Sequence, residues 1–132
     1  MQIEYLNPEG MHRNPAFSQG IIIPAGARLL LVGGQNAVNA DGEIVGKGDI
    51  GRQTEQALAN MLTVIDAAGG RIEDLVKVTL IIQHGVDLRA GFAAWMKVWG
   101  QRPNPPTVTA LFVAGLAHPD YLIEIEAQVV LP

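Results

Sequence analysis

The chain has 132 residues, of which 48% are apolar and 17% are charged, and its formal net charge is -4 at pH 7. This length fits a single domain, residues 1–132, that can bury roughly two-thirds of the surface of the unfolded chain. Cysteine is absent, which excludes disulfides, thiolate metal sites and a cysteine nucleophile. The chain opens without a basic segment followed by an apolar one, and no apolar run approaches the length of a membrane span. We therefore expect a soluble, cytoplasmic protein with no membrane partner.

Apolar and β-branched runs predict a set of strands separated by Gly and Pro residues. They span residues 20–23, 28–32, 75–82, 107–113 and 121–131, with a further short strand near 3–5. In the last run apolar residues alternate with Glu124, Glu126 and Gln128, so one face of that strand is apolar and the other is polar. The two carboxylates have no evident partner nearby, because no Lys or Arg follows Arg102.

Two other segments repeat apolar residues at helical spacing. The first begins at Asp49, which can cap the helix, and ends at Gly69. The second begins at Asp87, and its apolar stripe of Phe92, Trp95 and Trp99 is typical of a helix that packs on a core; we assign Trp95 and Trp99 to that core.

The order of these elements predicts an α/β (α+β) fold in which two helices cover one face of a mixed sheet. The strands at 28–32 and 75–82 are apolar on both sides, so their second face should also be buried. Packing against identical chains is the simplest way to bury this second face, so we expect a homo-oligomer.

Several common kinds of functional site find no support in the sequence. The three histidines lie in different predicted loops without acidic neighbours at ligand spacing, so we expect no metal site. The segment Gly33-Gly34-Gln35 follows a strand but lacks the other glycines of a dinucleotide loop, and we expect no cofactor. Its glycines could instead let backbone N–H groups face a cavity. A pI near 5.2 and scattered Lys and Arg residues disfavour a nucleic-acid partner.

Four stretches together resemble the Rid (YjgF) family in order and spacing. They are "NPAFSQG", "LLLVGGQNAVNADGEIVG", "GDIGRQTEQALANMLTVIDAAGGRIEDLVKVTLII" and "LIEIEA". The resemblance covers the chain from about Asn14 to its end. It implies a chorismate-mutase-like fold that forms a homotrimer, with sheets inside, helices outside and ligand clefts between subunits. Active members, also labelled endoribonuclease L-PSP or imine deaminase, hydrolyse 2-imino acids to 2-oxo acids and ammonia.

The resemblance also implies roles for single residues. In the family an arginine clamps the substrate carboxylate, a glutamate positions or activates water, and backbone groups of a glycine turn assist. Glu124 matches the glutamate, which makes it the candidate catalytic residue. Gly33 and Gly34 match the turn, and Phe17 stands where a tyrosine is usual.

Other positions depart from the family pattern. Val108 stands at the position of the clamping arginine, and a shift of one residue would make it Thr107 or Thr109. Ala110 replaces a cysteine of many members, and Phe92 replaces an asparagine of some. Phe17, Gly33, Gly34, Phe92, Val108 and Ala110 are therefore the candidate ligand-binding residues.

With these departures, we expect the homotrimer that the resemblance implies to bind a small, largely apolar metabolite between subunits, with Glu124 as the polar anchor and without the usual deaminase activity. If the protein is an enzyme, we expect a hydrolase of the imine deaminase type that uses Glu124. One alternative is an imine deaminase with a non-standard cation, for which Arg102 is the candidate. A ribonuclease or translation inhibitor is disfavoured by the acidic charge and by the lack of paired His or Lys residues. A last alternative is a purely structural cleft filled by Phe92 and Val108.

Overall fold

A computed structural model describes residues 2–132 of the chain. Its strands are β1 (Glu4–Leu6), β2 (Gly20–Ile22), β3 (Arg28–Gln35), β4 (Leu75–Gln83), β5 (Thr107–Val113) and β6 (Ile123–Leu131); its helices are α1 (Ile50–Ala67), α2 (Arg89–Trp99) and the short 3-10 helix η1 (Ile72–Asp74). Every predicted strand and helix forms. The second helix begins at Arg89 rather than Asp87, and the last strand at Ile123 rather than Tyr121.

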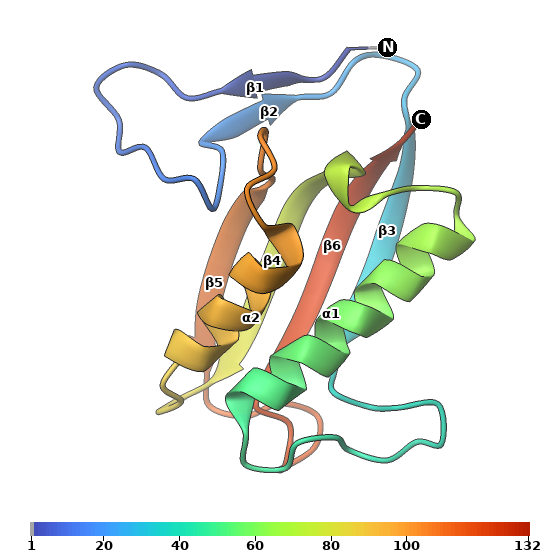
Figure 1. The fold of residues 1–132 in the computed structure, drawn as a ribbon, viewed down its shortest axis with the longest axis vertical. Coiled ribbons are helices and arrows are strands. Elements are labelled where there is room, and N and C mark those ends of the chain that lie inside the picture. Colours follow the sequence, from blue (N-terminus) through green and yellow to red (C-terminus); the bar gives the residue numbers. More distant parts are fainter. Residues whose placement is uncertain (1) are drawn as a thin grey trace.

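Four strands form a mixed sheet in the order β3-β6-β4-β5 (Figure 1). Strand β6 is antiparallel to both of its neighbours, whereas β5 is parallel to β4. The strands predicted at residues 20–23 and 28–32 lie in different sheets, because β2 pairs with β1 in a separate two-stranded sheet. The local sequence pattern predicts both strands. Which strand each of them pairs with depends on contacts between segments that are distant in sequence.

Both helices lie on the same face of the four-stranded sheet, as predicted (Figure 1). Helix α1 crosses β6 and β3, and α2 covers the side of β4 and β5. Asp49 caps α1 by accepting a hydrogen bond from the backbone N–H of Arg52. The mixed sheet with two helices on one face confirms the predicted fold class.

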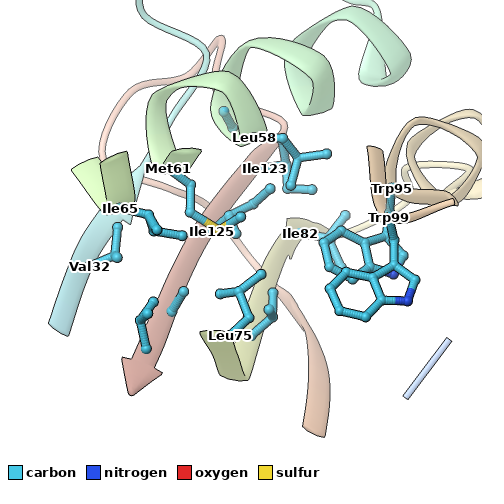
Figure 2. Close-up of a cluster of buried hydrophobic side chains, with 14 of the residues drawn as sticks. Val32, Leu58, Met61, Ile65, Leu75, Ile82, Trp95, Trp99, Ile123 and Ile125 are labelled. Atoms are coloured by element: carbon cyan, nitrogen blue, oxygen red, sulfur yellow. The ribbon is translucent and has the colours of Figure 1, made fainter. Parts of the chain in front are cut away.

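The core fills the space between the helices and the sheet (Figure 2). It includes Met61 and Ile65 from α1 and Ile125 from β6, all almost fully buried. Trp95 and Trp99 are buried as predicted, and their rings stack with centroids 5.7 Å apart. Burial of both rings in the core holds α2 against the sheet, and this position determines the site described below.

The other face of the sheet, here called the open face, is not covered by any helix of residues 2–132. It carries Leu29 and Leu31 of β3, which are 50% and 70% exposed, and Leu111 of β5, which is 48% exposed. Glu124, Glu126 and Gln128 share this face by the strand register. A single chain therefore leaves apolar sheet surface in contact with water.

One fully buried polar side chain, Gln53, joins α1 to two loops at the end of the sheet. Its amide nitrogen donates to the carbonyls of Gly46 and Asp120, at 3.2 and 2.9 Å, and its amide oxygen accepts from the backbone N–H of Leu122 at 2.9 Å. Both polar atoms of the Gln53 side chain are therefore paired, and these bonds fix the loop that leads into β6.

Replacing this glutamine should destabilise the protein. Gln53→Ala leaves the buried partners without hydrogen bonds, and we expect the free energy of unfolding to fall by about 2–4 kcal/mol. Urea denaturation at one fixed protein concentration measures it. Glu55→Ala, at an exposed position of the same helix, is the matched control and should change stability by less than about 0.5 kcal/mol. Equal stability of the two variants would refute the role given to Gln53.

Candidate functional site

A cavity of about 200 Å³ lies between the helices and strands β4, β5 and β6. Its walls come from the N-terminal loop, both helices and three strands: Asn14, Ala16, Phe17, Thr54, Leu58, Val78, Leu80, Leu88, Gly91, Phe92, Trp95, Val108, Ala110, Ile123 and Ile125. We call it the inner cavity. Four of the predicted ligand-binding residues, Phe17, Phe92, Val108 and Ala110, meet in its walls.

The walls of the inner cavity are almost entirely apolar. Thr54 is one of two polar residues among them, and its hydroxyl already donates to the carbonyl of Ile50 at 2.7 Å. The other is Asn14, whose side-chain oxygen accepts from the backbone N–H of Ala16 at 2.8 Å. No ionisable side chain lines the cavity. Such walls suit an uncharged apolar or aromatic group, as in other dry apolar cavities of similar size.

The shape of the inner cavity depends on the close approach of the two helices. Gly91 of α2 lies beside Thr54 of α1, and a Cβ atom at Gly91 would come within 3.0 Å of the threonine hydroxyl. Phe92 follows on α2 and is 52% exposed, although it lines the cavity. Because the Phe92 ring is exposed and also lines the inner cavity, it lies at the mouth of that cavity.

Glu124 lies on the open face of the sheet and not in the inner cavity. Ile81 of β4 is directly opposite Glu124 on one side and Leu111 on the other, so these three side chains share one face. The neighbouring Ala110 and Ile123 face the helices and line the cavity. Within one chain, the predicted catalytic residue is thus separated from four of the predicted ligand-binding residues by the thickness of the sheet.

Gly34 is the predicted residue that does lie beside Glu124. The pairing of β3 with β6 is irregular between Val32 and Gln35, so the two glycines form a bulge there. A Cβ atom at Gly34 would overlap the Glu124 carboxylate and would lie 2.7 Å from its Cδ, whereas a Cβ at Gly33 would meet nothing within 4 Å. Gly34 therefore provides the space that the carboxylate occupies. None of the ion pairs among residues 2–132 involves Glu124.

Comparison with known proteins places this arrangement in a family. The sequence model of the endoribonuclease L-PSP family matches residues 11–131. A RutC family protein from Pyrococcus horikoshii is 37% identical over 100 residues, which cover 75% of this chain and 76% of that protein. The chain belongs to the Rid family, of which endoribonuclease L-PSP is another label.

Solved structures of Rid proteins share the fold. A Rid family protein of unknown function from Yersinia pestis has a TM-score of 0.87 and 32% identity, with 99% of this chain and 100% of that chain covered. E. coli TdcF, solved with bound serine, has a TM-score of 0.72 and 26% identity, with coverage of 95% and 93%. The fold of residues 2–132 is therefore that of a Rid family subunit.

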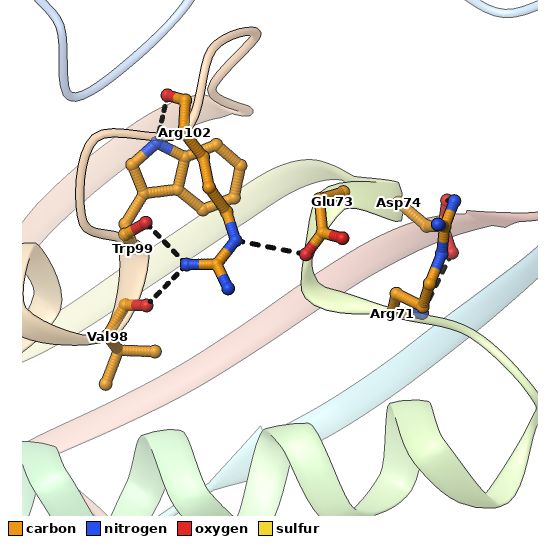
Figure 3. Close-up of polar contacts among 6 residues, drawn as sticks. All are labelled: Arg71, Glu73, Asp74, Val98, Trp99 and Arg102. Atoms are coloured by element: carbon orange, nitrogen blue, oxygen red, sulfur yellow. Dashed lines mark hydrogen bonds and ion pairs between the residues drawn. The ribbon is translucent and has the colours of Figure 1, made fainter.

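Arg102, considered above as a replacement cation for a Rid deaminase, does not line the inner cavity. Figure 3 shows the contacts that it makes instead. Its Nε lies 3.1 Å from a carboxylate oxygen of Glu73, and its Nη1 donates to the carbonyls of Val98 and Trp99 at 3.2 and 2.8 Å. These contacts tie the guanidinium to the C-terminal end of α2. The backbone carbonyl of Arg102 also accepts from the Trp99 indole at 3.1 Å.

The remaining candidates from the sequence are scattered. His12, His84 and His118 are exposed in three separate loops, and no group of three metal-ligating side chains comes together within residues 2–132. In the same part of the chain, no helix has the length and apolar character needed to cross a membrane.

The sequence did not single out Asn14 or Thr54 as wall residues of the inner cavity. Leu88 lies on the same apolar stripe of α2 as Phe92, so its place in the wall could have been predicted from that spacing.

Enlarging Gly34 should move the Glu124 carboxylate without unfolding the protein. The clash in Gly34→Ala falls on the far end of a side chain that can rotate, so we expect stability to change by no more than about 1 kcal/mol. Crystal structures of Gly34→Ala and of the control Gly33→Ala check the position of the carboxylate. It should turn away in the first variant and stay in place in the second. An unmoved carboxylate in Gly34→Ala would show that the bulge does not position Glu124.

Proposed function

We propose that this Rid protein is a homotrimer that binds a small, largely apolar metabolite in clefts between its subunits and does not carry out the usual deamination of 2-imino acids. The observation that carries the proposal is the inner cavity, where Phe17, Phe92, Val108 and Ala110 meet and no charged side chain lies in the walls.

The identity of residue 108 decides which ligands fit. An arginine there would offer a carboxylate two parallel charge-assisted hydrogen bonds, and the valine offers none. The neighbouring threonines cannot replace it, because neither Thr107 nor Thr109 carries a positive charge. Transfer of an ionised carboxylate into apolar walls without a partner is strongly unfavourable. The apolar part of a ligand, in contrast, gains about 25 cal/mol for each Å² removed from water.

Two features support assembly into a trimer with a shared site. The exposed leucines of the open face, Leu29, Leu31 and Leu111, are better buried against a second subunit than left in water. Strand β5, which contributes Val108 and Ala110 to the cavity, is an edge strand of the sheet. A neighbour that packs its open face near this edge would bring its own Glu124 towards the cavity of the first subunit. In that arrangement Glu124 is the polar anchor of the cleft.

The inner cavity should bind a neutral aromatic probe such as toluene. Ala110→Leu adds carbon atoms to the wall, and we expect affinity to fall about tenfold, which corresponds to roughly two methylene groups that no longer fit, at ~0.8 kcal/mol each. Isothermal titration calorimetry measures the affinity. Ala93→Leu is the matched control, since Ala93 is exposed on α2 and does not line the cavity. Light scattering should give the mass of three chains for the wild type and both variants. No binding to the wild type, or equal binding to both variants, would contradict the proposal.

The wild-type protein should not accelerate the hydrolysis of 2-iminopropanoate, because no cation in the inner cavity holds its carboxylate. The imine can be generated in place from serine by a dehydratase, and the release of the 2-oxo acid is followed against a blank without the protein. Arg102→Ala serves as the second sample. Acceleration by the wild type that disappears in Arg102→Ala would replace the proposal with the deaminase alternative.

A further inference from the structure

A second, more open cavity of about 460 Å³ adjoins the inner one. Asn14 and Phe17 line both, so the two cavities share a wall in the N-terminal loop. The rest of this outer cavity comes from Asn7, Arg13 and the proline-rich loop around Asn104. A ligand that extends past Phe17 could therefore occupy both cavities at once.

The outer cavity has the charge and the hydrogen-bond donors of an anion site. Arg13 lines it, and no Asp or Glu does. Among residues 2–132, Arg13 takes part in none of the ion pairs and none of the side-chain hydrogen bonds, in contrast to Arg102. Its guanidinium is thus available to a ligand.

The asparagines of the outer cavity add donors. The side-chain oxygen of Asn7 accepts from the backbone N–H of Gln19 at 3.2 Å, and that of Asn14 accepts from Ala16 at 2.8 Å. Each oxygen is engaged locally, which leaves the amide nitrogens as the groups that can reach a ligand. Asn104 has a φ of 58°, in the left-handed region that asparagine adopts in turns, and lies in the loop that lines this cavity.

We propose that the outer cavity binds a carboxylate through Arg13, so that the ligand is a small monocarboxylate whose aromatic or aliphatic part fills the inner cavity. This inference rests on the proposed function, because the apolar part of the ligand needs the inner cavity. One guanidinium without a second cation beside it suits a single negative charge, and its planar fork matches a carboxylate. The carboxylate stays in the open outer cavity and avoids transfer into apolar walls.

A pair of matched probes tests this assignment: 3-phenylpropanoate and its neutral amide, 3-phenylpropanamide. Calorimetry with the wild type should show about fivefold tighter binding of the acid, a preference that shrinks as salt is added, because Arg13 is exposed. Arg13→Gln should bind both probes equally, with the affinity of the amide unchanged. Arg52→Gln removes an exposed arginine that lines neither cavity, and it should keep the preference.

The possible outcomes separate this inference from the proposed function. If the wild type binds the amide but shows no preference for the acid, the outer site is refuted and the inner cavity stands. A preference that survives in Arg13→Gln also refutes it, since the carboxylate would then be held elsewhere. If the wild type binds neither probe, the proposed function fails, and the inference fails with it.

Discussion

The alternation of side chains along β6 is the constraint on which the rest of the structure depends. This strand lies between β3 and β4, and its residues Ile123, Ile125, Ala127 and Val129 are buried under the helices. Glu124 is on the other face. Because the side-chain period of a strand is two, a shift of one residue would exchange the faces and expose the core. The register transmits the same division across the sheet, so the inner cavity and the carboxylate are kept on opposite sides of one subunit.

This division explains why a single subunit is an incomplete version of the proposed cleft. The apolar walls and the mouth residue Phe92 belong to the helix face, whereas Gly34 and Glu124 belong to the open face. Leu111 lies in the same register row of the open face as Glu124, whereas Leu29 and Leu31 lie further along the sheet, opposite Val130 and Gln128. Burial of these exposed leucines would favour association. The same contact that removes these leucines from water would supply the missing carboxylate. In the proposed trimer, stability of the assembly and completion of the cleft would therefore be two consequences of one interface.

Much of the fold follows from periodic patterns that the sequence displays openly. The alternation in β6 and the helical spacing after Asp49 and Asp87 predict elements that the structure confirms within two residues, apart from a longer β3. The pairing of β2 with β1 could not be predicted, because it joins segments separated by a long loop. For the site, resemblance to a family identified four wall residues that no local pattern connects. It could not show that these four residues line the helix face, away from Glu124, because the strand order and the register that place Val108 and Ala110 are tertiary features.

The two cavities together suggest how the proposed site would discriminate against short 2-imino acids. In a 2-imino acid the carboxylate and the imine carbon are adjacent, so an arginine must stand close to the reacting atoms. Here Val108 lines the inner cavity, and the cation, Arg13, lines the outer one. A ligand can satisfy both only if several apolar atoms separate its charge from the end that is buried. A short imino acid would have to give up either its contact with the cation or its place in the inner cavity, and burial of its charge in apolar walls would be opposed by desolvation. In the proposed site, the separation between charge and cavity would therefore select for the length of the ligand as well as for its polarity.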